Sequence, residues 1–268
     1  MEVNNDYDFS LPMASLLHVG TSEVHEDARS IKGGIRLTQG ELDKEEYLYY
    51  LMMLWHIYTE LERGIEAHAS YPTLQSTYNP TLLARTRSIS QDISCLLAVP
   101  EAEWQTHPSH ISLMASPPKA FVEYTTRIRE LSESSDPTRL LAHAYVRYLG
   151  DLSGGQIIRR RIANAYNLDV DRGDDGIRLY HFKKLDSSET ANIGDIKKIK
   201  EWYKDGMNTG IGDDTTLKGQ RLYWKRPCWP SSSVSVFSNY YQARGESRNH
   251  RSRLSQRRNR LRRCMTQY

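Results

Sequence analysis

Apolar residues recur every three or four positions along most of the chain, which is the pattern of amphipathic helices. The pattern predicts helices over residues 13–31, 42–69, 81–98, 117–133 and 189–206. One stripe of the second helix carries Leu48, Leu51, Trp55, Tyr58 and Leu61. Strand patterns are nearly absent, and we expect an extended piece only at 177–182. The fold class is therefore all-α.

A further helix is predicted from Asp136-Pro137 to about Tyr166, and glycines at positions 150, 154 and 155 interrupt it. Each glycine inside a helix costs roughly 1 kcal/mol relative to alanine. Gly150 and Gly154 are four residues apart, so they open the same side of the helix, where a flat ligand could lie against the main chain. The alternative is a glycine-rich turn between two ordinary helices.

Two other motifs overlap this segment. The run from Leu152 to Gln156 spells the signature loop of transport ATPases, but the Gly-Lys pair of their phosphate-binding loop occurs nowhere in the chain. The basic residues 159–161 after a turn also outline a DNA-reading helix-turn-helix. That form needs one short turn rather than a tyrosine- and arginine-bearing helix before it, so a ligand platform is favoured.

Composition limits the compartment and the number of domains. A chain of 268 residues with 38% apolar content can bury one sizeable core. Its three cysteines, Cys95, Cys228 and Cys264, form neither a disulfide framework nor a C-x-x-C site, which favours a reducing compartment. We see no signal peptide and no run of eighteen apolar residues, so we expect a cytoplasmic protein without a transmembrane anchor.

Charge divides the chain near Gln220. Residues 221–268 carry one lysine, eleven arginines and one acid, a charge of +11, and the total of +3 leaves −8 for residues 1–220. The basic segment cannot bury enough apolar surface to offset its ordering entropy, so we predict that it is disordered. It is either a solvated tail or an arm for nucleic acid or acidic lipid.

The nine residues YLGDLSGGQ at 148–156, preceded by AHAYVR at 142–147, resemble the distal-helix signature of the heme oxygenases. These all-α enzymes open heme to biliverdin, ferrous iron and carbon monoxide. The resemblance covers residues 12–220 and implies a single multihelical domain with a kinked distal helix, followed by the Arg-rich tail 221–268. The family continues with a long amphipathic helix where this chain breaks away at Arg221, and one hypothesis is a shifted reading frame or a retained intron.

An axial ligand for heme iron is implied at His25. It lies in Thr21-Ser-Glu-Val-His25, which resembles the proximal T-x-x-V-H pattern of the family, although a lone histidine on an amphipathic helix is usually a surface residue. His18 stands where the family has a lysine that pairs with a heme propionate. Arg29 replaces the usual acidic partner of the ligating imidazole.

The distal residues follow from the same resemblance. Gly150 and Gly154 would hold the heme edge close to the main chain, and Asp151 would order a water network that feeds protons to the bound oxygen. Arg147 and Tyr58 match other members of that network, although Tyr58 can equally be a core tyrosine.

The two heme propionates need cations or hydroxyls. The family takes them from a tyrosine of the distal signature, here Tyr145, and from two basic residues, here Lys200 and Lys204. These lysines are one helical turn apart and share a face, as a pair of propionates requires.

The function that the resemblance implies is oxygenation of heme b, which is both substrate and cofactor, with O2 and with electrons from NADPH through a flavoprotein reductase. We expect a monomer with no specific nucleic-acid partner, whose reductase docks on basic residues around 197–204 and 159–161 and brings it to the cytosolic face of the endoplasmic reticulum. The alternative is a non-catalytic protein that binds or sequesters heme and has an incomplete C-terminal core. In a third possibility the Arg-rich tail carries the function, as a nucleic-acid-binding arm on a helical scaffold.

Overall fold

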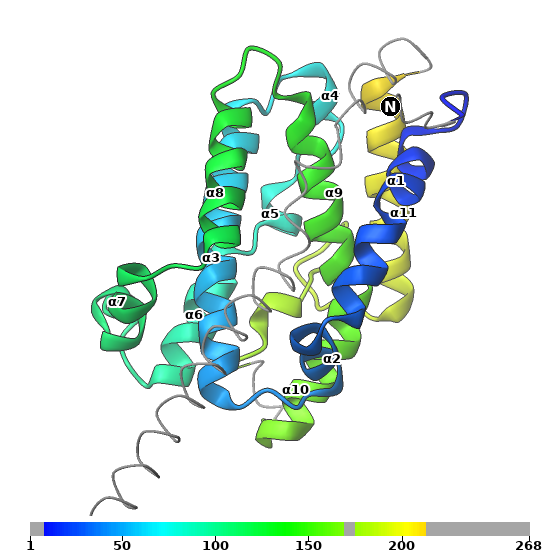
Figure 1. Cartoon of the computed structure of the whole chain (residues 1–268). Coiled ribbons are helices and arrows are strands. Elements are labelled where there is room, and N and C mark those ends of the chain that lie inside the picture. The colour runs from blue at the N-terminus through cyan, green and yellow to red at the C-terminus, as the bar shows by residue number, and fades with distance from the viewer. Residues whose placement is uncertain (1–7, 169–174, 213–268) are drawn as a thin grey trace, which may run out of the picture.

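The central helix of the computed structural model is α3, Lys44–Ala67, which corresponds to the helix predicted over 42–69 (Figure 1). Asp43 begins it with a capping box, because its side chain accepts from the Glu46 N–H while Glu46 accepts from the Asp43 N–H. The structure describes residues 8–168 and 175–212. Within them α3 packs against α6, Thr86–Leu97, and α8, Lys119–Ser132, so it is buried on more than one side.

The first predicted helix is confirmed as α1, Met13–Ser30. The extended backbone of Ile31 ends it, and a second helix that the pattern did not predict, α2, Lys32–Gln39, follows directly. Gly40 closes α2 in the left-handed region, at φ 74°, where a residue without Cβ is favoured.

Short helices connect the longer ones, and several begin at a proline, whose fixed φ suits the first helical position. The segment between Pro72 and Pro80 holds one of them. The connecting elements are α4 (Pro72–Gln75), α5 (Pro80–Leu83), η1 (Trp104–Thr106), α7 (Pro108–Ala115) and η2 (Pro137–Arg139).

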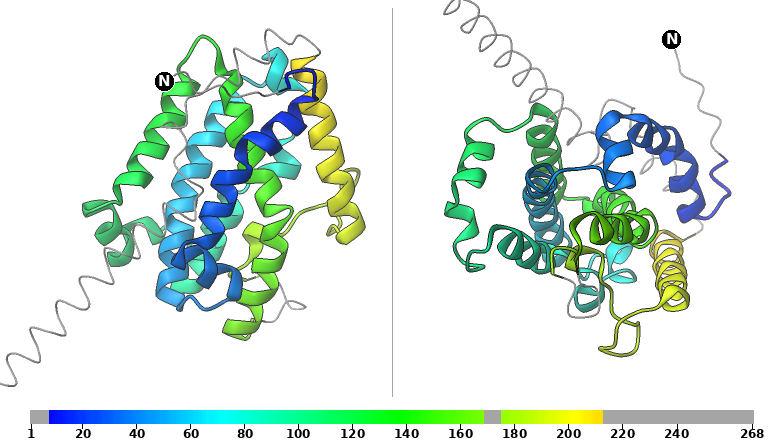
Figure 2. Two further views of the ribbon diagram at one scale, coloured as in Figure 1. Left: turned by 45° about the vertical axis from the view of Figure 1, so that its right-hand side comes forward. Right: turned by 90° about the horizontal axis from the view of Figure 1, so that it is seen from below.

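The predicted glycine-interrupted helix consists of two helices, α9, Leu140–Asp151, and α10, Gly154–Tyr166. The change of direction lies at Ser153, whose φ of −119° and ψ of −88° are outside the helical region. The distal segment is therefore bent, as the glycines predicted. Figures 1 and 2 show α1 running beside it.

The extended piece predicted at 177–182 is wrong. The structure has a 3-10 helix there, η3, Arg178–Tyr180, because the buried Asp92 carboxylate of α6 accepts from the backbone N–H groups of Arg178 and Leu179 at 2.8 and 2.9 Å. The β-pairing in the described residues is an isolated bridge between Lys183 and Thr190.

The last described helix is α11, Ile193–Ile211, somewhat later than the predicted 189–206. Asn192 and Asp195 form its capping box. It runs antiparallel to α1, and the Asn208 side chain accepts from the Ala14 N–H at 3.0 Å (Figure 1). None of the helices in residues 8–168 and 175–212 is long and apolar enough to cross a membrane. The predicted tail, 221–268, lies outside these ranges.

Candidate functional site

The glycines of the bent segment have two different environments. A Cβ placed on Gly155 would lie 2.9 Å from the Tyr180 ring, so close packing requires that glycine. A Cβ on Gly150 or Gly154 would have nothing within 4 Å. Both of these residues are exposed, so the packing of the described residues does not explain them. They leave bare main chain facing open space.

The backbone groups freed by the bend are hydrogen-bonded. The Leu152 and Ser153 N–H groups donate to the carbonyls of Tyr148 and Gly150 at 2.9 and 3.2 Å. The Gln156 side chain donates to the Asp151 carbonyl at 3.1 Å and to the Tyr180 carbonyl at 2.9 Å. Gln156 therefore ties the bend to η3, a role that the sequence alone did not indicate.

Asp151 and Tyr58 meet directly although they are far apart in the sequence. The Tyr58 O–H donates to Asp151 Oδ2, and Tyr58 comes from the middle of α3, where its side chain is fully buried. Burial raises the pKa of the Asp151 carboxyl to about 6, and the Tyr58 hydrogen bond, Arg147 and Arg85 partly oppose that rise. Burial also raises the pKa of Tyr58, and the negative charge of Asp151 adds to the effect.

Arg147 places a buried positive charge beside this pair. It is 8% exposed, and its Nε atom makes no hydrogen bond to any described residue. Burial works against its charge, but Tyr124, Tyr58 and Asp151 raise its pKa overall. A buried donor without an acceptor is uncommon in folded proteins and is a position where a water or ligand oxygen would be stabilised.

Arg85 is a member of this electrostatic group that sequence reasoning missed. Its guanidinium donates to the carbonyls of Leu82, Leu83 and His181 and lies 4.2 Å from the centre of the Phe182 ring. It lowers the pKa of Asp151 through its charge. No local pattern marks an arginine just before a helix as buried, so the sequence held no signal for it.

The predicted imidazoles lie on α1. His18 and His25 are two helical turns apart on one face, and both are exposed, whereas Leu17 and Thr21 are buried. The replacement of the acidic partner by Arg29 concerns a side chain outside the described set.

The predicted propionate partners lie on α9 and α11. Tyr145 of α9 is 7% exposed. On α11, Lys200 is half-buried and Lys204 is exposed, both beside the buried face that carries Tyr203 and Met207.

Helix geometry relates these lysines to α1. The helices α1 and α11 run antiparallel and meet at the contact between Ala14 and Asn208. His18 is one turn after Ala14, and Lys204 is one turn before Asn208, so the two residues lie at the same level. Of the predicted site residues, the structure joins Tyr58 and Asp151 by a hydrogen bond, with Arg147 beside them, and places the others on the surrounding helices.

The chain is similar to heme oxygenases over most of its length. Residues 11–219 match the model of the heme oxygenase family. The chain belongs to this family. Heme oxygenase 1 of Nostoc sp. is 31% identical over 210 residues, which cover 78% of this chain and 78% of that protein. Heme oxygenase 1 of Bos taurus is 31% identical over 204 residues, 75% of this chain, and the chain spans 63% of the bovine protein's length.

A solved structure confirms the fold of the heme oxygenase family. The crystal structure of heme oxygenase-2 from Synechocystis sp., in complex with heme and NO, superposes with a TM-score of 0.67. The two chains are 25% identical, and the superposition covers 85% of this chain and 83% of that one. The all-helical fold with a bent helix that the sequence predicted is therefore confirmed.

The residues present fit a heme. No group of three or more His, Cys, Asp and Glu side chains in residues 8–168 and 175–212 could hold a bare metal ion. A single exposed imidazole such as His25 suits an iron whose other positions a porphyrin fills. The exposed main chain at Gly150 and Gly154 is accessible to a ligand, since no described atom lies within 4 Å of a Cβ placed there.

Proposed function

We propose that this chain is a heme oxygenase that opens heme to biliverdin, ferrous iron and carbon monoxide. The observation that carries the proposal is the open space over Gly150 and Gly154 next to the hydrogen-bonded pair of Asp151 and Tyr58. Family membership and a 25% identical relative solved with heme and NO support it. When bound, heme supplies both the iron at which O2 is activated and the ring that is oxidised.

The two glycines serve this reaction by presenting no side chain. A side chain over the iron that could donate or accept a proton would favour cleavage of the O–O bond without attack on the ring. Main chain at Gly150 and Gly154 would offer no such group on the distal side of a bound heme. We assign these two glycines to the distal wall of the site.

Proton supply belongs to Asp151 in this proposal. A pKa of about 6 leaves the carboxylate mostly ionised at pH 7 but able to take up a proton at low cost. One carboxylate oxygen accepts from Tyr58, and the other remains available to accept from a water. The free Nε–H of Arg147 can hold a second water, so the three residues together would support a short water chain toward the distal side.

The opposite wall and the rim of the site complete the assignment. His25 would ligate the iron through a neutral imidazole from α1. His18, Tyr145, Lys200 and Lys204 would hold the two propionates with hydroxyl and charge-assisted hydrogen bonds, which sets the in-plane orientation of heme. This orientation would decide which edge of the ring faces Gly150.

Electron delivery also belongs to the proposal. NADPH would reduce a flavoprotein reductase, which would dock through the basic residues around 197–204 and 159–161. The monomeric state and the cytoplasmic location at the endoplasmic reticulum surface are part of the same proposal. In the described residues Lys197 pairs with Glu201, and Lys198 with Asp195, at 3.8 and 3.9 Å, so the α11 surface is mixed in charge.

One assay tests the proposal. Purified protein is mixed with hemin, a flavoprotein reductase, NADPH and oxygen, and the absorption spectrum is followed. We expect a Soret band that forms and then decays as bilin absorption rises. A stable Soret band would show a heme-binding protein without turnover, and no Soret band would reject a heme site altogether. The His25→Ala variant, with imidazole added back as a control, should lose and regain the histidine-ligated band.

A further inference from the structure

The short helix η3 lies between α6 and the bent distal segment, and α6 holds its first end. Asp92 of α6 is 0% exposed, and its two carboxylate oxygens accept from the Arg178 and Leu179 N–H groups. Hydrogen bonds to an ionised acceptor are shorter and stronger than those between neutral groups. The position of η3 is therefore set by a buried side chain that lies outside the distal segment.

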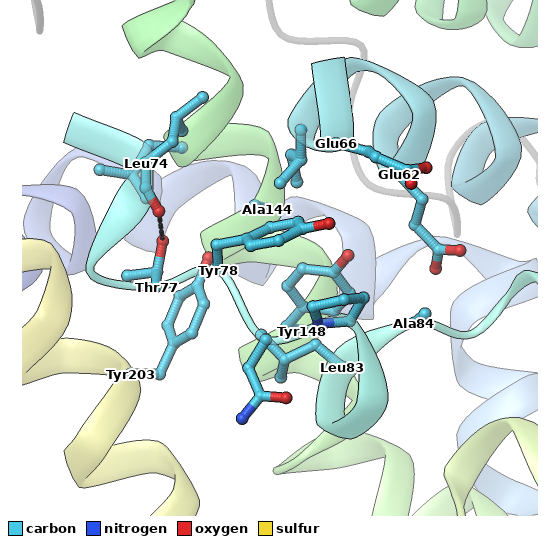
Figure 3. Close-up of a pocket in the computed structure, with 14 residues that line it drawn as sticks. Glu62, Glu66, Leu74, Thr77, Tyr78, Leu83, Ala84, Ala144, Tyr148 and Tyr203 are labelled. Carbon is cyan, nitrogen blue, oxygen red and sulfur yellow. Dashed lines mark hydrogen bonds between the residues drawn. The ribbon is translucent and has the colours of Figure 1, made fainter. Parts of the chain in front are cut away.

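The residues around Arg85 hold the other end of η3. The Arg85 guanidinium donates at 2.6 Å to the carbonyl of His181, the residue that ends η3. The Glu62 carboxylate of α3 accepts from the Arg85 backbone N–H at 2.5 Å. Figure 3 shows the Glu62 side chain extending from α3 toward Ala84, the residue before Arg85. Both ends of η3 are thus attached to the core of the bundle.

From this fixed position η3 contacts the bend at two points. The Gln156 side-chain nitrogen donates both to the Asp151 carbonyl, at 3.1 Å, and to the Tyr180 carbonyl, at 2.9 Å. A side-chain amide has two N–H groups, so a single nitrogen can serve both carbonyls. The Tyr180 ring also packs against Gly155, where a Cβ would lie 2.9 Å away. The main chain on both sides of Ser153 is therefore attached to η3.

The bend itself creates the need for this side chain. In a continuous helix the Asp151 carbonyl would accept from the Gly155 N–H, four residues later. The Ser153 backbone leaves the helical region and ends α9 two residues before that point. The Gln156 amide supplies a donor to the Asp151 carbonyl instead. An apolar side chain of the same length would fill the space but leave this carbonyl without that donor.

We infer that Gln156 and η3 position the bent main chain of the distal segment, and that Asp92 is the residue that fixes η3 for this purpose. Both are positioning residues, since they act through the backbone and through η3. The inference rests on the proposed function where it concerns heme, because the segment that they hold carries Gly150, Asp151 and Gly154. Loss of Gln156 should displace the Asp151 carboxyl and the two exposed glycines together.

The pKa of the Asp151 carboxyl in the heme-free full chain reports its position, and NMR titration measures it. Gln156→Met keeps the length of the side chain and removes both donors. We expect the Asp151 pKa to fall from about 6 toward 3.8, because a loosened bend gives the carboxyl more water. Asp92→Asn should move it in the same direction. The charges that act on Asp151 belong to Arg147 and Arg85, so this second effect would be transmitted through η3.

Three controls separate position from stability. Asn164→Leu replaces another amide of α10, on its exposed surface, and should leave the Asp151 pKa unchanged. Ile128→Val removes a buried methyl group from α8, so it lowers stability but should not move the pKa either. In the Gln156→Met background, Asp92→Asn should change the pKa less than it does alone, because both residues act through the same contact.

Hemin titration followed by absorption tests the same residues on the distal wall. Gln156→Met should weaken hemin binding about 2- to 10-fold, the worth of one hydrogen bond, whereas Asn164→Leu and Ile128→Val should not change it. An unchanged Asp151 pKa in Gln156→Met would overturn the inference. A changed pKa with unchanged hemin affinity would also overturn it, since the distal wall would not depend on Gln156.

Failure of the proposed function would look different. If the native chain binds no hemin, the heme site is rejected, and the Asp151 pKa alone then decides whether Gln156 holds the bend. Circular dichroism checks the folding of each variant. If Asp92→Asn does not fold, Gln156→Met and its two exposed and buried controls carry the test.

Discussion

The two faces of α9 are built in opposite ways. On the back, Leu141, Ala144 and Tyr148 are buried against the rest of the bundle. On the front, Gly150 is exposed, and a Cβ there would meet nothing. The back face contributes stability through packing, while the front face gives up helix propensity to keep its main chain accessible. Packing of the back face therefore fixes the position of the bare main chain at Gly150 on the front face.

The largest effect should come from the packed face. Leu141→Ala removes a side chain that is 0% exposed, and it should lower the free energy of unfolding by about 2–5 kcal/mol. Urea unfolding followed by circular dichroism measures it. A loss below about 1 kcal/mol would mean that the back of α9 is less important to the fold than its burial indicates.

The next largest effect on stability distinguishes two adjacent glycines, Gly154 and Gly155. Gly155→Ala places a Cβ 2.9 Å from the Tyr180 ring, so it should destabilise the protein by about 1–3 kcal/mol through overpacking. Gly154→Ala is the matched control, since its Cβ has nothing within 4 Å. Thermal unfolding of both variants compares them, and equal midpoints would contradict the difference between the two positions.

A smaller effect concerns pH. Because the folded-state pKa of Asp151 is raised from 3.8 to about 6, the folded protein binds this proton more tightly than the unfolded chain does. The associated stability is fully present below about pH 3.8 and is lost as the pH rises through 6. Asp151 is partly exposed, so we expect on the order of 1–2 kcal/mol.

Asp151→Asn isolates that contribution, because the amide keeps the size of the side chain and does not titrate. Urea unfolding from pH 4 to 7 should show the native chain losing stability relative to the variant across the pH 4–6 window. Parallel curves for the two proteins would show that the carboxyl has an ordinary pKa.

The smallest effect should be a gain. Gly150→Ala adds a methyl group that meets nothing in the protein and improves helix propensity, so stability should rise by about 0.5–1 kcal/mol. The same methyl group enters the space proposed for heme and should weaken hemin affinity. Denaturant unfolding and hemin titration measure the two changes, and a variant that binds hemin as tightly as the native chain would place the ring elsewhere.

Several elements could be predicted because their cause is local. The stripe along 42–69 and the run from 13 predicted α3 and α1 nearly to their ends, and the three glycines predicted the bend between α9 and α10. Apolar spacing and missing Cβ atoms act within a few residues, so a single sequence displays them.

Other elements depend on distant residues and were missed or mistaken. The segment 177–182 became a 3-10 helix because Asp92, far away in the sequence, caps it. The burial of Arg85 depends on carbonyls and a ring from other segments. No short-range pattern records such contacts, since they exist only once the helices have packed.

The sequence by itself determined most of the long helices, the bend and the family, because periodicity, glycine spacing and the distal motif are properties of neighbouring residues. Only the tertiary structure decided that Tyr58 reaches Asp151, and that Gly155 is required by packing while Gly150 and Gly154 are not. The physical reason is that burial, which raises the pKa of Asp151 and leaves the Arg147 Nε–H without an acceptor in the described residues, is a property of the packed helices together.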